Sequence, residues 1–180
     1  MFLVLSGITL FASLALSTVY VFTKDPIALS KMAKKQNAIK SVLPPFDHFD
    51  SKPIVQVEGT EITKIYRAFD KSNTFVGSAV EATTSRGYKG GIEIIVGFDK
   101  SGVIKDYFVL EQNETPGLGA KMVNWFKTNK GKQNILGLNP GETFMTVKEV
   151  DAITAATISS KAFLGAVQNA YNAYSMNIPE

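Results

Sequence analysis

The segment that decides the fold is GYKGGIEIIVGFDKSGVIKDYFVLEQ, residues 87–112. Two runs rich in β-branched and aromatic residues, 92–98 and 103–110, flank the tetrapeptide Asp99-Lys100-Ser101-Gly102. Such runs, separated by a short turn that contains glycine, predict a β-hairpin. The glycines at positions 87, 90 and 91 fit either the close approach of a bulky ligand or a simple bend into the strand.

The segments on either side of this hairpin indicate the fold class. Short alternating runs at 54–59, 61–69 and 74–82 predict further strands. From Ile158 onward, apolar residues recur every three to four positions up to Tyr174, which predicts one long helix with a single buried face. Because strands and helices do not alternate in a repeating βαβ order, we expect an α+β domain with antiparallel strands and a long C-terminal helix.

The N-terminal segment predicts a membrane anchor. Residues 1–23 carry no acidic or basic side chain of the Asp, Glu, Lys, Arg or His type, and a helix of this length reaches roughly 33 Å, enough to cross a bilayer. A cleaved signal peptide is the alternative, but that class of segment has a basic start and a shorter apolar run. Tyr20 and Phe22 stand where interfacial aromatic residues are expected. A retained transmembrane helix is therefore favoured.

The next segment predicts a stalk. In residues 26–40, spaced apolar residues alternate with lysines, a pattern that predicts a helix, and Pro44-Pro45 is expected to end it. The predicted organisation is a transmembrane helix at 1–23, a stalk at 24–43 and one domain at 44–180. Five lysines follow the span, and the positive-inside tendency alone would place the domain in the cytoplasm, although large domains translocate with less regard for charge.

Charge and composition exclude several classes of function. The net charge of +3 comes from the stalk: taking its five lysines and Asp25 from the chain's 19 basic and 16 acidic residues leaves 14 and 15. A nucleic-acid partner is therefore not expected. The chain has no cysteine, which excludes disulfides and iron–sulfur clusters bound by this chain. It has a single histidine, His48, so no metal site is expected and His48 receives no role.

The start of the C-terminal helix carries the candidate chemistry. Residues 150–162, VDAITAATISSKA, are rich in small and hydroxyl side chains. A helix start offers unsatisfied N–H groups and the positive end of the helix dipole, and small side chains let a phosphate come close. Thr157, Ser159 and Ser160 could each cap the helix, which is the structural alternative for any one of them.

Residues 151–160, DAITAATISS, resemble the flavinylation motif of FMN-binding domains. In that family a flavin transferase of the ApbE type attaches FMN to the last threonine of the motif through a phosphoester, and that threonine is Thr157 here. Asp151 matches the leading acid and Thr154 the first hydroxyl residue, while Ala155 stands where glycine is usual and adds one methyl group. The resemblance implies a cofactor-binding segment that also includes Ala156, Ser159 and Ser160.

A second segment, ETPGLG at 114–119, is similar to the part of the same family that lies against the isoalloxazine ring. The resemblance assigns Glu114, Thr115, Leu118 and Gly119 to the ring. Gln112 stands where family members commonly have histidine. Trp125, in the short amphipathic segment that follows, is expected to pack in the core rather than on the flavin.

The order of motifs and the single span look most like the G subunit of the Rnf electron-transport complex, and next like the C subunit of the sodium-translocating NADH:quinone reductase. The resemblance implies a covalently flavinylated electron-transfer subunit in the bacterial inner membrane, with its domain on the periplasmic side. Its expected partners are the other membrane and redox subunits and the ApbE-type transferase. Thr157 would be a tether, so no catalytic residue is expected. The alternatives are a membrane-tethered scaffold without flavin and a flavoenzyme with its own substrate.

Overall fold

The computed structural model describes residues 1–50, 52–58 and 61–178, which form two compact units, 1–37 and 38–180. Helix α1 (Phe2–Val42) supplies the first unit and continues through Pro26. In the described residues it is the one helix long and apolar enough to cross a membrane, judged by length and composition, and its apolar part has no buried residue. It ends at Val42, just before the Pro44-Pro45 pair.

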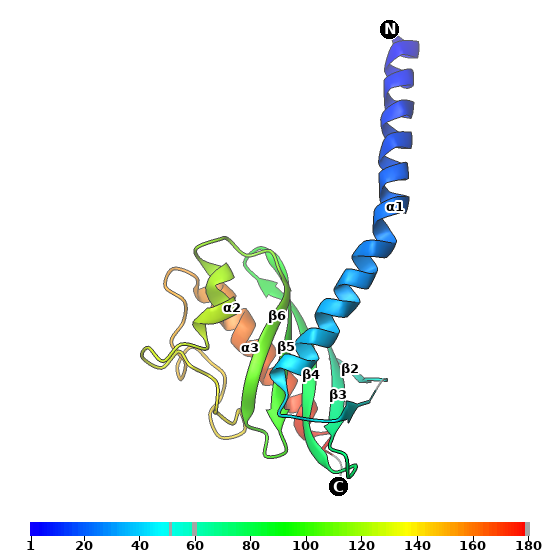
Figure 1. Cartoon of the computed structure of the whole chain (residues 1–180). Coiled ribbons are helices and arrows are strands. Elements are labelled where there is room, and N and C mark those ends of the chain that lie inside the picture. The colour runs from blue at the N-terminus through cyan, green and yellow to red at the C-terminus, as the bar shows by residue number, and fades with distance from the viewer. Residues whose placement is uncertain (51, 59–60, 179–180) are drawn as a thin grey trace. The chain divides into compact units, whose positions relative to one another are not determined.

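The second unit is built on an antiparallel sheet (Figure 1). The strands run in the order β1-β3-β4-β5-β6, and β2 pairs with β3. This arrangement confirms the expected α+β class and the hairpin of residues 92–110, which corresponds to β5 and β6. The bounds are β1 (His48–Phe49), β2 (Ile54–Glu58), β3 (Glu61–Phe69), β4 (Phe75–Gly87), β5 (Gly90–Asp99) and β6 (Ile104–Gln112).

The turn between β5 and β6 forms for a local reason. One carboxylate oxygen of Asp99 accepts hydrogen bonds from the backbone N–H groups of Ser101 and Val103, at 2.9 and 3.1 Å. An aspartate side chain that bonds to the backbone two residues on is the usual stabiliser of such a turn. The turn therefore fixes the register of the two strands beside the cavity described below.

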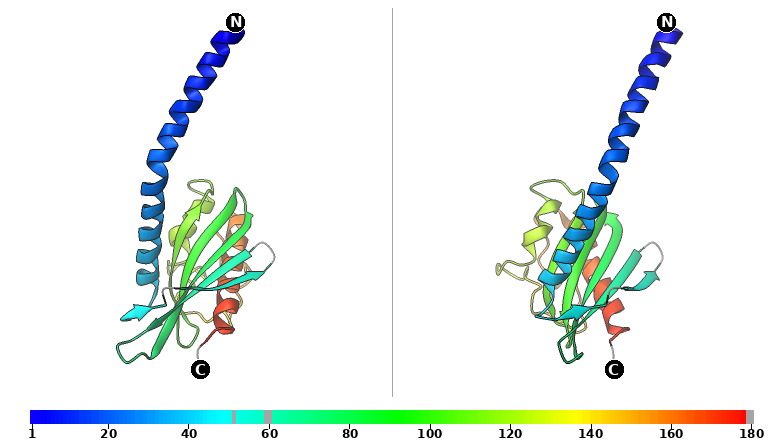
Figure 2. Two further views of the ribbon diagram at one scale, coloured as in Figure 1. Left: turned by 90° about the vertical axis from the view of Figure 1, so that its right-hand side faces the viewer. Right: turned by 45° about the vertical axis from the view of Figure 1, so that its right-hand side comes forward.

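Helix α3 (Thr157–Ser175) covers one face of the curled sheet (Figure 2). Its buried face makes the main core, where Phe163 stacks on Phe126 at 4.7 Å between ring centroids and meets the ring of Tyr107 edge-on. The hydroxyl of Tyr107 donates to the carbonyl of Met122 at 2.7 Å, and burial raises the pKa of this phenol. The predicted single buried face of the C-terminal helix is confirmed.

The opposite face of the sheet has its own small core, which includes Ala38, Ile39 and Val42 from the last turn of α1. Gly97 in β5 makes this contact possible, since a Cβ atom there would lie 1.9 Å from the carbonyl oxygen of Val42. Any larger residue at position 97 would therefore push the end of α1 off the sheet.

Residues 113–156 connect the sheet to α3 with little regular structure. The predicted amphipathic segment is reduced to the 3₁₀ turn η1 (Gly119–Lys121) and the single helical turn α2 (Met122–Trp125). Trp125 is half-buried against the main core and its indole N–H donates to the carbonyl of Asp151 at 3.0 Å. Trp125 therefore packs as expected and takes no place in the cavity.

Candidate functional site

A cavity of about 510 Å³ lies where three elements meet: the β4–β5 turn, the loop after β6 and the first turn of α3. The loop after β6 is the ETPGLG segment, and the first turn of α3 belongs to the DAITAATISS segment. The two segments that the sequence singles out independently therefore meet in one place. The lining residues are Tyr88, Glu114, Thr115, Leu118, Gly119, Ala155, Ala156, Thr157, Ile158 and Ser159.

Glu114 is the buried polar centre of this cavity, with 5% of its surface exposed. Oε2 accepts a hydrogen bond from the Ser159 hydroxyl at 2.7 Å, and Oε1 accepts one from the backbone N–H of Lys89 at 3.1 Å. The backbone N–H of Glu114 itself donates to the side-chain oxygen of Gln112 at 2.6 Å. The first two bonds hold the carboxylate in one orientation and tie together all three elements of the site, and the third fixes the backbone at the start of the loop.

Gly119 allows the loop after β6 to pack directly on the start of α3. A Cβ atom at this position would lie 2.5 Å from Oγ of Ser159 and 2.8 Å from Oε2 of Glu114. Both distances are shorter than real carbon–oxygen contacts, so any larger residue would separate Ser159 from Glu114. The last glycine of ETPGLG is thus required by packing.

Thr157 is the first residue of α3, and its side chain is exposed at the edge of the cavity. The N-cap residue is Ala156, which has no side chain to bond the first-turn N–H groups, and no acidic residue occupies the first turn. α3 thus has no acidic side chain of its own in its first turn, although the carboxylate of Glu114 bonds to Ser159 in that turn and offsets part of the positive end of the helix dipole. Free N–H groups at a helix start favour an anion.

Ser160 is fully buried and stabilises the loop instead of capping the helix. Its hydroxyl accepts from the backbone N–H of Ile153 at 2.9 Å and donates to the carbonyl of Ala156 at 2.9 Å. Between these anchor points, Ala155 adopts a left-handed conformation with φ of 61°. Glycine is the residue that takes this conformation without strain, which gives a physical reason for the glycine that is usual at this position of the motif.

Asp151 lies outside the cavity lining. One of its carboxylate oxygens accepts from the backbone N–H of Lys132 at 2.6 Å, and its carbonyl accepts from Trp125. Thr154, which is exposed, and Ser160, which is buried, also lie outside the lining. The structure thus brings eight of the eleven predicted residues to the cavity, and it places Asp151, Thr154 and Ser160 in the loop that supports it.

Two lining residues, Tyr88 and Ile158, are missing from the sequence prediction. Tyr88 lies between glycines 87 and 90, the glycines considered above as a point of close ligand approach. Ile158 follows Thr157 and is 54% exposed, an unusual environment for isoleucine. In both cases the sequence signal that could have identified the residue is the same. A bulky side chain stands among small residues in a segment that was already singled out.

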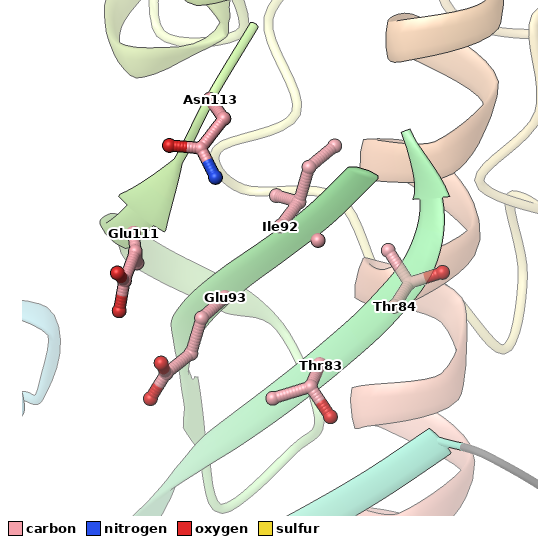
Figure 3. A pocket seen from close by; sticks show the side chains of 7 residues that line it. Thr83, Thr84, Ile92, Glu93, Glu111 and Asn113 are labelled. Atoms are coloured by element: carbon pink, nitrogen blue, oxygen red, sulfur yellow. The ribbon is translucent and has the colours of Figure 1, made fainter. Parts of the chain in front are cut away.

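Two other hollows in the second unit lie away from both motif segments. Figure 3 shows one of about 290 Å³ at the end of β4, β5 and β6, where Glu93 and Glu111 are paired across neighbouring strands. Another, of about 400 Å³, lies between β2, β3 and α3 beside Glu61. Neither contains a predicted site residue, and within the described residues no group of three metal-binding side chains occurs.

Comparisons with known proteins identify the family of the domain that holds this cavity. The family model of the FMN-binding domain matches residues 87–172, which include the β4–β5 turn, both motif segments and most of α3. The G subunit of an ion-translocating oxidoreductase complex from Vibrio vulnificus is 32% identical, over 82% of this chain and 75% of the relative. The G subunit of a Na⁺-translocating ferredoxin:NAD⁺ oxidoreductase complex from Acetobacterium woodii is 30% identical, over 96% and 89%. The G subunit of a proton-translocating ferredoxin:NAD⁺ oxidoreductase complex from Clostridium ljungdahlii is 32% identical, over 91% and 84%.

Proposed function

The chain belongs to the FMN-binding domain family represented by the G subunit of ion-translocating oxidoreductase complexes, and on this premise we propose that it is the covalently flavinylated electron-transfer subunit of such a complex, of the Rnf type. The observation that carries the proposal is the position of Thr157, exposed at the start of α3 and at the edge of the one cavity that joins both motif segments in the described chain. FMN, when bound, accepts and donates electrons one at a time.

The residues present fit FMN. A cavity of about 510 Å³ lies within the range of roughly 300–1,000 Å³ typical of cofactor sites. A phosphate on Thr157 would lie at the start of α3, where free N–H groups favour an anion and the helix has no acidic residue of its own in the first turn. Glu114 and Thr115 line the cavity, and a carboxylate and a hydroxyl there would help to orient a flavin and to set its potential.

We assign Thr157 the role of tether. Its hydroxyl would lose its proton and attack the FMN phosphorus of FAD, so that the phosphoester to FMN forms as AMP leaves, and an ApbE-type transferase would reach it because the side chain is exposed in the folded domain. Because this attachment is covalent, FMN would not dissociate, and the cavity would not need to bind it tightly. The 2.7 Å hydrogen bond between Ser159 and Glu114 holds two walls of the cavity together, the first turn of α3 and the loop after β6.

The rest of the proposal concerns the membrane. Residues 1–23 would span the bacterial inner membrane, residues 24–43 would form the stalk, and residues 44–180 would hold FMN on the periplasmic side. The span has no charged side chain, so the coupled ion would cross through other subunits. Those subunits are the proposed redox and membrane partners.

Intact-protein mass spectrometry tests the cofactor assignment. Full-length protein is expressed with and without an ApbE-type transferase, and the expected result is a transferase-dependent gain of one FMN residue on the peptide that contains Thr157. Thr157→Ala is expected to abolish the gain, whereas Thr146→Ala, another exposed threonine outside the cavity, should retain it. Absence of the gain with a transferase that modifies a control protein would overturn the proposal and favour a scaffold without flavin.

A cysteine-labelling experiment tests the orientation. Because the chain has no cysteine, Ser175→Cys places a single thiol at an exposed position near the end of α3. A membrane-impermeant maleimide should label this thiol in intact spheroplasts if the domain is periplasmic. Labelling that requires lysis of the spheroplasts would place the domain in the cytoplasm, as the five lysines of the stalk suggest.

A further inference from the structure

Tyr88 is held at the edge of the cavity by its backbone. Tyr88 and Lys89 form the turn between β4 and β5. The N–H of Lys89 donates to the buried carboxylate of Glu114 at 3.1 Å, and this bond fixes the turn to the opposite wall. The Tyr88 side chain lines the cavity from that fixed position.

The side chain of Tyr88 is by contrast unengaged. It is 67% exposed, and among the described residues it makes no hydrogen bond or aromatic contact. An aromatic ring is a large apolar surface whose burial is favourable, and it prefers another π-system in a stacked or edge-on arrangement. The molecule therefore leaves an aromatic surface available at this cavity.

The remaining walls carry a complementary apolar surface. Leu118, from the loop after β6, is 40% exposed, and Ile158, from the first turn of α3, is 54% exposed. Both line the same cavity as Tyr88 but come from the two other elements. A flat aromatic ligand needs contacts on both of its faces, and these three side chains supply an aromatic and an aliphatic surface for them.

We propose that Tyr88 stacks on the isoalloxazine ring of the FMN tethered at Thr157, with Leu118 and Ile158 as the aliphatic contacts. The inference rests on the proposed function, because it needs FMN at this cavity. Tyr88 is then a positioning residue, which keeps the ring docked and shields it from water. Loss of an aromatic pair should lower the ratio of docked to undocked ring by about two- to thirteenfold.

The test uses flavinylated full-length protein in detergent and three variants. Tyr88→Ala removes the ring, Tyr88→Phe keeps a ring without the phenol, and Phe144→Ala removes an equally exposed aromatic residue outside the cavity. Mass spectrometry first establishes one FMN in each protein. Flavin fluorescence yield, fluorescence anisotropy and accessibility to iodide quenching are then compared, because a stacked phenol quenches an excited flavin and restricts its motion.

Tyr88→Ala is expected to raise the fluorescence yield several-fold, to lower the anisotropy and to increase iodide quenching. Tyr88→Phe should raise the fluorescence yield yet keep the anisotropy, and Phe144→Ala should match the flavinylated protein without substitution. The inference is overturned if Tyr88→Ala carries one FMN with unchanged yield and anisotropy, or if Tyr88→Phe loses as much anisotropy as Tyr88→Ala. Absence of FMN from the protein without substitution is a different result, which refutes the proposed function itself.

Discussion

Replacement of Ala155 by glycine should stabilise the protein. Ala155 is held at φ of 61°, and a left-handed alanine costs about 1–2 kcal/mol. Glycine takes this conformation freely but loses about 0.5–1 kcal/mol of extra backbone entropy on folding. With middle values of about 1.5 and 0.75 kcal/mol for these two terms, the expected net gain for Ala155→Gly is about 0.75 kcal/mol, or roughly 1.5–3 °C in the melting temperature of a domain of this size.

Thermal unfolding of the full-length protein in detergent, followed by circular dichroism, measures this gain. Asn73→Gly is the matched control, because Asn73 has φ of 58° and lies outside the cavity. Asparagine tolerates the left-handed region better than alanine does, so the control should gain less. An unchanged or lower melting temperature for Ala155→Gly, with the control unaffected, would refute the assignment of strain to Ala155.

The same variant bears on the cofactor. Ala155 is exposed and lines the cavity, so the removed methyl group only widens the approach to Thr157. The rate at which a transferase loads FMN, followed by mass spectrometry over time, should be equal or higher in Ala155→Gly. A slower rate would mean that the alanine contributes to recognition by the transferase.

Three further changes test the packing around the site and the core. Ser160→Ala leaves the buried N–H of Ile153 without its acceptor, so chemical denaturation should show a loss of about 1–3 kcal/mol; Ser175→Ala, exposed in the same helix, should change stability by less than about 0.5 kcal/mol. Gly119→Ala should separate Ser159 from Glu114 and weaken iodide protection of the flavin, and unchanged protection would argue against the tight packing of this loop. Burial raises the pKa of Tyr174 to about 12. The stability that the neutral phenol contributes is therefore complete below about pH 10 and is lost as the pH rises through about 12. In an alkaline denaturation series, Tyr174→Phe should lose less stability over that range than the protein without substitution.

Much of the fold follows from local pattern. The β5–β6 hairpin, the C-terminal helix and the apolar N-terminal helix were all predictable, because each depends on a periodicity or a turn residue within one short segment. The short amphipathic segment after Gly119 was predicted as more regular than it is. There the chain gives only a 3₁₀ turn and a single helical turn, since Trp125 is directed to the core and to the carbonyl of Asp151.

The two segments that line the cavity could be singled out from the sequence alone, because ETPGLG and DAITAATISS can each be recognised from adjacent residues. Tertiary structure decided what the individual side chains do. Ser159 and Glu114 are 45 positions apart and meet only when α3 packs on the loop after β6. Hydrogen-bond partners and cavity walls are set by distances between remote elements, and a linear motif contains no information about those distances.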